Sequence, residues 1–153
     1  MPRISEIVLL KTNEQPTMVV RTTTKVEKLP LVIGDSYRRI AVYLKELDEL
    51  CADVPFVAYH NMDMQNLDVE IGFPVAKALP EKGDIKPGLI PAGKVVFCMY
   101  RGAYGNMAPV YGEMAKWITD NGHRPTGICY EHYYNSPGVP ESELLTKIVM
   151  PLE

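Results

Sequence analysis

Short runs of apolar residues, many of them β-branched, recur along most of the 153-residue chain. Runs of this kind, bounded by turn residues, are typical of β-strands. They occupy residues 18–24, 56–61, 67–75, 94–101, 127–134 and 144–152. The pattern therefore predicts six strands.

Two other segments repeat apolar residues every three or four positions, which is the period of a helix that packs by one face. The first helix is expected soon after Gly34 and the second over residues 107–121, where Asn121 and Gly122 form a suitable helix end. The two stripes are Tyr37, Ile40, Ala41, Leu44 and Leu47, and Met107, Val110, Tyr111, Met114, Trp117 and Ile118. Each helix is expected to pack its stripe against a sheet.

The order strand, helix, strand, strand occurs twice, with Pro74 and Pro151 at the same place in each copy. We expect a single domain, residues 1–153, with one repeat at about 16–78 and the other at about 94–153. The stretch 79–93 holds three prolines and three glycines and is predicted to be a linker. These features predict an α+β fold of two pseudo-symmetric β-α-β-β repeats. The repeats would form one antiparallel sheet with two helices on one face and a ligand groove between the helices.

Charge and hydropathy narrow the classes of function. Lys and Arg number 16 against 19 Asp and Glu, a net charge of -3, so direct nucleic-acid binding is not expected. No apolar run approaches the roughly 20 residues that span a bilayer, and the N-terminus has no signal-peptide pattern. We expect a cytoplasmic protein that does not bind membranes.

The cysteines and histidines show no catalytic or metal-binding spacing. Cys51, Cys98 and Cys129 are far apart, which predicts buried free thiols and neither a disulfide framework nor a metal site. The sequence around His123 and His132 does not show the spacing of a Ser/His/Asp or Cys/His catalytic constellation. No cofactor is expected.

One predicted strand carries a carboxylate among tyrosines. Period two places Cys129, Glu131 and Tyr133 on one face of that strand. A carboxylate buried without a partner is strongly unfavourable or takes up a proton, and a bound organic cation would remove that penalty. Tyrosine rings also offer a favourable face to a cation. The alternative is that Glu131 points to solvent and that the tyrosines only favour a strand.

These residues resemble the GyrI-like effector-binding domain, the ligand-binding module of several AraC-type and MerR-type multidrug regulators and of small stand-alone proteins. The matching residues are Gly102, Tyr104, Tyr111 and Trp117, followed by Glu131, Tyr133, Asn135 and Pro137. The resemblance implies a groove that takes bulky aromatic, often cationic compounds, with Glu131 at its floor. Because the first repeat begins by about Met18, no helix-turn-helix fits before it, and a stand-alone member is expected.

Four further aromatic residues are candidate ligand contacts beside Glu131 and Tyr133. Tyr111 and Trp117 lie on the apolar stripe of the second helix, where core packing is the alternative. Tyr37 and Tyr104 each follow a glycine turn at a predicted helix start, which suggests the two lips of the groove.

The first repeat has no carboxylate at the matching place. When Tyr59 is aligned with Tyr130, His60 takes the place of Glu131. A histidine at a strand end more often has a structural partner than a role in a ligand site, so His60 is not counted among the ligand contacts.

The leading hypothesis is a stand-alone protein that captures lipophilic, aromatic, cationic small molecules. A second is a hydrolase of reactive cyclopropane-bearing natural products, an activity that the resemblance implies for some stand-alone members. There Glu131 would activate water and Tyr111 would donate a proton. A third is a gyrase-inhibitor-like interaction protein. The sequence does not choose among them, nor does it give the ligand or the oligomeric state.

Overall fold

The computed structural model describes residues 3–135 and 138–153. These residues form strands and helices that fall into two compact units. We call residues 13–92 the central unit, and residues 3–12 with 93–153 the terminal unit. Both units combine a long helix with antiparallel strands, which confirms the predicted α+β class.

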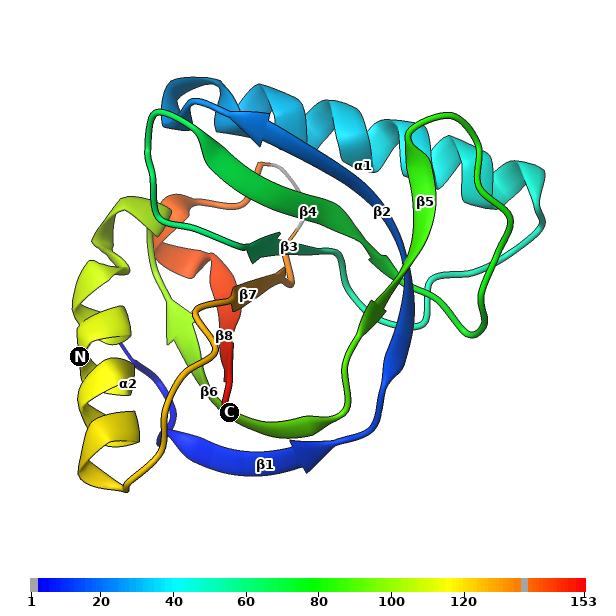
Figure 1. The fold of residues 1–153 in the computed structure, drawn as a ribbon. Helices are drawn as coiled ribbons and strands as arrows, with labels where there is room; N and C mark the ends of the chain where they lie inside the picture. Colours follow the sequence, from blue (N-terminus) through cyan, green and yellow to red (C-terminus); the bar gives the residue numbers. More distant parts are fainter. Residues whose placement is uncertain (1–2, 136–137) are drawn as a thin grey trace. The chain divides into compact units, whose positions relative to one another are not determined.

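The central unit contains β2 (Gln15–Thr24), α1 (Leu29–Glu46), β3 (Phe56–Tyr59), β4 (Leu67–Pro74) and β5 (Ile85–Ile90). Its strands are ordered β3-β4-β2-β5, and every neighbouring pair is antiparallel. Helix α1 runs along β2 and β4 (Figure 1). The strand-helix-strand-strand order predicted for this part of the chain is therefore present, with β5 added.

Helix α1 buries a stripe that is shifted from the predicted one, because Ser36 and Tyr43 are buried as well. Ile40 and Leu44 lie in the core with Met18 and Val20 of β2, as expected, whereas Ala41 is exposed. The core of this unit consists of Met18, Val20, Ile40, Tyr43, Leu44, Val75, Leu79 and Ile85. Packing against β2 and β4 thus fixes which side of the helix is buried.

The start of α1 corrects a prediction. The helix begins at Leu29, and Pro30 lies in its first turn. Backbone N–H groups in the first turn have no partner within the helix, so a proline there costs no hydrogen bond. Gly34 therefore lies inside the helix instead of in a turn before it, and Tyr37 lies near the middle of α1. The expectation that Tyr37 opens a helix was wrong.

The terminal unit contains β1 (Val8–Thr12), β6 (Gly93–Arg101), α2 (Ala108–Asp120), β7 (Cys129–Tyr133) and β8 (Leu145–Pro151). Its strands are ordered β1-β6-β8-β7, again all antiparallel. Helix α2 lies beside β6 (Figure 1). Its core consists of Val96, Cys98, Tyr100, Met107, Val110, Met114, Ile118, Cys129, Ile148 and Leu152, with Tyr111 and Trp117 partly buried against it.

Two strands were not predicted. β5 lies inside residues 79–93, which the sequence marks as a linker, because Pro87 and Gly88 read as turn residues. Within the central unit β5 pairs with β2 alone, and an edge position accommodates proline without losing a ladder hydrogen bond. β1 was not predicted because its apolar and polar residues do not alternate. Val8, Leu9 and Leu10 are consecutive and all exposed.

The cysteines are free thiols, as predicted. Cys98 and Cys129 are buried in the terminal unit, but Cys51 is exposed, which corrects the expectation that all three are buried. Cys51 lies after α1 in a segment whose pairing is an isolated bridge to Val75.

Neither a membrane-spanning helix nor a metal-binding cluster is found in the part of the chain that the structure describes. None of its helices is both long and apolar enough to cross a bilayer. No group of three or more His, Cys, Asp or Glu side chains is arranged to hold a metal ion there.

Candidate functional site

Glu131 lies on the helix side of β7. Its partner on β8 is Ile148, which is fully buried in the core beneath α2. Cys129, two residues earlier, belongs to the same core. Because alternate residues of a strand share a face, the Glu131 side chain points toward α2, as period two predicts.

Two tyrosine hydroxyls hold the Glu131 carboxylate. Tyr111 on α2 donates to Oε2, and Tyr133 donates to Oε1 at 2.7 Å. A carboxylate can accept about four hydrogen bonds, so both oxygens keep room for another partner. Within residues 3–135 and 138–153, no Lys, Arg or His forms an ion pair with Glu131. Its negative charge is therefore hydrogen-bonded but not neutralised by an ion pair within this part of the chain.

Burial controls the protonation of this site. It raises the pKa of the Glu131 carboxyl, and the hydroxyls of Tyr111 and Tyr133 oppose that rise without cancelling it. Burial also raises the pKa of Tyr111, to which the neighbouring Cys129 and Glu131 add. Burial raises the pKa of the Cys129 thiol as well, to about 12. Tyr111 and Cys129 stay protonated at neutral pH, so Glu131 sets the charge of these three groups.

Tyr104 extends the site toward solvent. It begins a short 3-10 turn ahead of α2, and its ring meets the ring of Tyr133 edge to face, with centroids 5.4 Å apart and planes at 68°. The Tyr104 side chain is 49% exposed. Burial of its hydroxyl and the charge of Glu131 both raise the pKa of Tyr104. Tyr104, Tyr111, Glu131 and Tyr133 thus form one cluster, which we call the Glu131 group.

Two predicted ligand contacts lie outside this group. Trp117 follows Tyr111 by six residues, roughly 9 Å along α2 and about 120° around it. Its ring stacks on His123, with centroids 6.3 Å apart and planes at 1°. Tyr37 belongs to the central unit, where its ring meets Phe73 at 5.3 Å. The roles of Trp117 and Tyr37 as ligand contacts stay predictions.

His60 has a structural partner, as expected. Its Nε2 lies 2.5 Å from Oε1 of Glu70 on β4. Its backbone N–H also donates to the carbonyl oxygen of Asp68. Both contacts tie the end of β3 to the neighbouring strand.

The residue that matches Glu131 in the central unit is Val57. Val57 lies opposite Ile71 in the β3–β4 pair, as Glu131 lies opposite Ile148 in the β7–β8 pair. Val57 is fully buried. The alignment that placed His60 opposite Glu131 was therefore wrong, and the central unit has an apolar residue at that place.

Asn135, another residue of the sequence motif, has a structural role. Its Oδ1 accepts a hydrogen bond from the backbone N–H of Leu145, the first residue of β8. This bond ties the chain after β7 to the strand beside it. Pro137, the last residue of the motif, lies outside the described residues.

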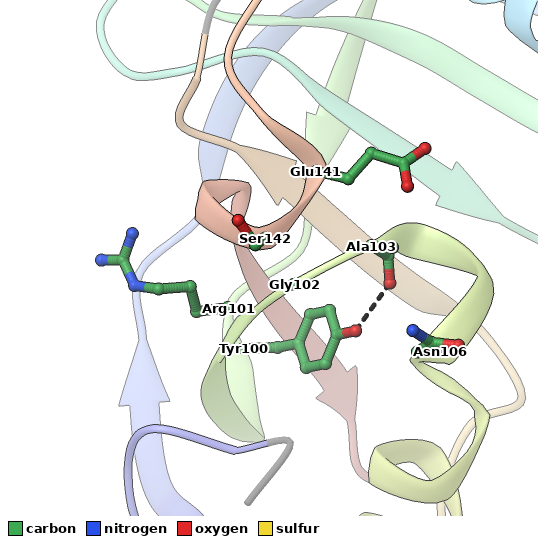
Figure 2. Close-up of a pocket in the computed structure, with 7 residues that line it drawn as sticks. All are labelled: Tyr100, Arg101, Gly102, Ala103, Asn106, Glu141 and Ser142. Atoms are coloured by element: carbon green, nitrogen blue, oxygen red, sulfur yellow. Dashed lines mark hydrogen bonds between the residues drawn. The ribbon is translucent and has the colours of Figure 1, made fainter.

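A surface depression of about 530 Å³ lies at the end of β6 (Figure 2). It is lined by Tyr100, Arg101, Gly102, Ala103, Asn106, Glu141 and Ser142. Gly102 has a φ of 144°, and a Cβ there would lie 2.8 Å from the Tyr100 hydroxyl, so this turn requires glycine. None of the predicted ligand contacts lines it. Apart from the Gly102 turn, no sequence signal pointed to these residues, because isolated polar residues carry no periodicity.

A model of the GyrI-like small molecule binding domain family matches residues 5–153. The chain belongs to this family. The family match confirms the resemblance and assigns the chain to a class of small-molecule-binding domains. No curated protein sequence matches it.

Solved structures share this fold. The GyrI-like chain resembles the C-terminal domain of EcmrR, with a TM-score of 0.76 and 23% identity over 98% of both chains. In the complex of EcmrR with DNA the TM-score is 0.82 at 22% identity, and the match covers 97% of this chain and 57% of EcmrR. The chain therefore spans little more than half of that protein.

Two less similar sequences also have this fold. A hydrolase from Listeria innocua has a TM-score of 0.71 at 13% identity, over 100% of this chain and 94% of the other. SAV2435 bound to tetraphenylphosphonium has a TM-score of 0.62 at 12% identity, over 97% of this chain and 94% of the other. At such identities the likeness concerns the fold alone.

Proposed function

We propose that this GyrI-like domain binds lipophilic aromatic cations at the Glu131 group. The observation that carries the proposal is the Glu131 carboxylate, which is partly buried and held by two hydroxyls but has no ion-pair partner within the described residues. Electrostatic attraction is stronger where water is excluded. A bound cation would supply the charge partner and favour the ionised carboxylate.

The tyrosines around Glu131 suit an aromatic guest. Tyr104, Tyr111 and Tyr133 offer ring faces, each worth about 0.5–2 kcal/mol to a cation positioned over it. Tyr104 is half exposed and marks the side from which a ligand arrives. SAV2435, a protein of the same fold, was solved with tetraphenylphosphonium, a bulky aromatic cation. That precedent supports the choice of ligand class and of probe.

The role that fits this chemistry is capture of several related compounds, as a buffer or as the effector-binding part of a regulator. The shared fold with EcmrR, solved in complex with DNA, supports the second form. We also propose that the chain is one domain built from two repeats and that it is cytoplasmic. Tyr37 and Trp117 are proposed as further ligand contacts. Tyr37→Leu and Trp117→Leu should each weaken cation binding, and unchanged affinity would show that the residue is not a ligand contact.

The direct test is a calorimetric titration with tetraphenylphosphonium. Glu131→Gln keeps the shape of the side chain and removes its charge, so we expect at least about tenfold weaker binding, a loss on the order of 1.4 kcal/mol. Glu81→Gln is the control, because Glu81 is exposed and pairs with Lys86 in the central unit. Equal affinities for wild type and Glu131→Gln would contradict the proposal.

A hydrolase is the second candidate, favoured by the pair of Glu131 and Tyr111. The Glu131 carboxyl has a raised pKa and can accept a proton from water, while the protonated Tyr111 can donate one. For a strained cyclopropane, the hydroxyl of water would bond to one ring carbon and the ring C–C bond would break. The other carbon would take the proton of Tyr111, and Glu131 would pass the proton it took from water back to Tyr111. Mass spectrometry of an electrophilic cyclopropane incubated with wild type, Glu131→Gln and Tyr111→Phe separates the candidates. A hydrated product that requires both residues would establish hydrolysis, and no product with wild type would leave binding as the function.

A further inference from the structure

Tyr104 connects the Glu131 group with the depression of Figure 2. Ala103 and Asn106, which lie close to Tyr104 on its two sides along the chain, both line the depression. The Tyr104 ring packs on Tyr133, whose hydroxyl binds Glu131. The chain on both sides of Tyr104 therefore borders the depression, and Tyr104 itself belongs to the Glu131 group.

The depression offers both donors and acceptors. Arg101 Nη1 donates to the carbonyl oxygen of Glu143 at 3.1 Å and lies 3.5 Å from its carboxylate, which holds the guanidinium in place. An arginine has about five N–H donors, so others remain for a guest. Within the described residues the side chains of Asn106, Glu141 and Ser142 form no hydrogen bond. An amide and a hydroxyl can each donate and accept.

The charges of the lining indicate what kind of group fits. Arg101 and Glu141 are exposed and carry opposite charges, and their formal sum is zero. Such a surface favours a neutral group that both donates and accepts hydrogen bonds over a second full charge. The volume of about 530 Å³ is ample for such a group, since whole small-molecule sites usually measure roughly 300–1,000 Å³.

We propose that this depression binds a neutral hydrogen-bonding arm of an aromatic cation whose charged part lies at Glu131. The inference rests on the proposed function and narrows its ligand class to aromatic cations with a hydroxyl or amide substituent. Arg101, Asn106 and Ser142 then determine specificity among cations, whereas Glu131 determines that a cation binds.

Two phosphonium ions that differ by one amide test this division. Tetraphenylphosphonium has no hydrogen-bonding group, whereas (4-carbamoylphenyl)triphenylphosphonium carries one amide on one ring. Wild type should bind the amide derivative several-fold more tightly. Asn106→Ala combined with Ser142→Ala should abolish that preference and leave tetraphenylphosphonium binding unchanged. Both side chains are exposed, so folding should be unaffected, and Lys116→Ala on the outside of α2 is the control.

The outcomes separate this inference from the function on which it rests. If wild type shows no preference for the amide, or the double variant keeps it, the depression is not the subsite, although loss of binding in Glu131→Gln would still support the cation site. If wild type binds neither phosphonium ion, the proposed function fails and the subsite fails with it.

Discussion

At the scale of single residues, two opposing effects act on the protonation of Glu131. Burial favours its neutral form, while the Tyr111 and Tyr133 hydroxyls favour the carboxylate. In the proposed function, a bound cation also favours the carboxylate. Binding should therefore be linked to the protonation of one side chain, and the tyrosines should set the pH at which it occurs.

Tyr111→Phe tests that linkage. Loss of one donor should raise the pKa of Glu131 further, so that the carboxylate forms only at higher pH. Tetraphenylphosphonium affinity, measured calorimetrically across a pH series, should then rise at a higher pH than in wild type. Tyr104→Phe is the matched control, because within the described residues the Tyr104 hydroxyl donates no hydrogen bond to Glu131. An unshifted pH profile in Tyr111→Phe would show that its hydroxyl does not tune the carboxyl.

Stability should depend on the same carboxyl. Since the pKa of Glu131 is raised in the folded state, the folded protein binds more protons than the unfolded chain between the ordinary value of about 4.3 and the raised value. The free energy of unfolding therefore falls as pH rises through that window. Glu131→Gln should lack this fall and should be more stable than wild type at pH values above that window. Urea unfolding of wild type and Glu131→Gln in a pH series measures this difference. If the free energies of unfolding of the two proteins changed with pH in parallel, the raised pKa would not belong to Glu131.

The Glu131 group was largely predictable because the strand and helix periods determine which way each side chain points. Period two in β7 places Glu131 and Tyr133 on one face, and the helical period places Tyr111 on the inner side of α2. The structure brings these three together. Tyr37 was misplaced relative to its helix because propensity alone does not locate a helix start. Which ligand the site prefers depends on exposed polar groups, and these follow no sequence pattern.

At the scale of elements, the strands show where sequence patterns succeed and fail. Strands with a buried face, such as β4 and β8, appear as apolar runs and were predicted within a few residues. β1 and β5 were missed because their residues are mostly exposed and are not selected for burial. Tertiary pairing, which the local sequence does not encode, decides their conformation.

Close strand packing gives a prediction for β4. A Cβ on Gly72 would lie 2.1 Å from the carbonyl oxygen of Met18 on β2, and backbone cannot move aside. Gly72→Ala should therefore destabilise the protein by about 2–4 kcal/mol in urea unfolding.

Gly34→Ala is the matched control for that substitution. Gly34 lies inside α1, where an added Cβ meets nothing within 4 Å. Alanine there should stabilise the protein by about 0.5–1 kcal/mol, because glycine is unfavourable in a helix interior. If both substitutions proved equally tolerated, the close approach of β4 and β2 would be contradicted.

At the scale of the whole molecule, the net charge is small, at -3. A general electrostatic field of that size favours cations only weakly and is screened by salt. Selection of cations should therefore depend on Glu131 and survive at moderate ionic strength. An isosteric anion separates the effect of charge from that of shape, because shape and apolar surface stay constant.

The most direct measurement compares tetraphenylphosphonium with tetraphenylborate, which has nearly the same shape and the opposite charge. Calorimetric affinities for wild type and Glu131→Gln in about 0.15 M salt, where charges are screened beyond roughly 8 Å, give four numbers. The account predicts that wild type binds the cation far more tightly than the anion and that Glu131→Gln removes most of the difference. Equal affinities in wild type, or a preference that Glu131→Gln leaves intact, would contradict the assignment of Glu131 as the group that selects cations.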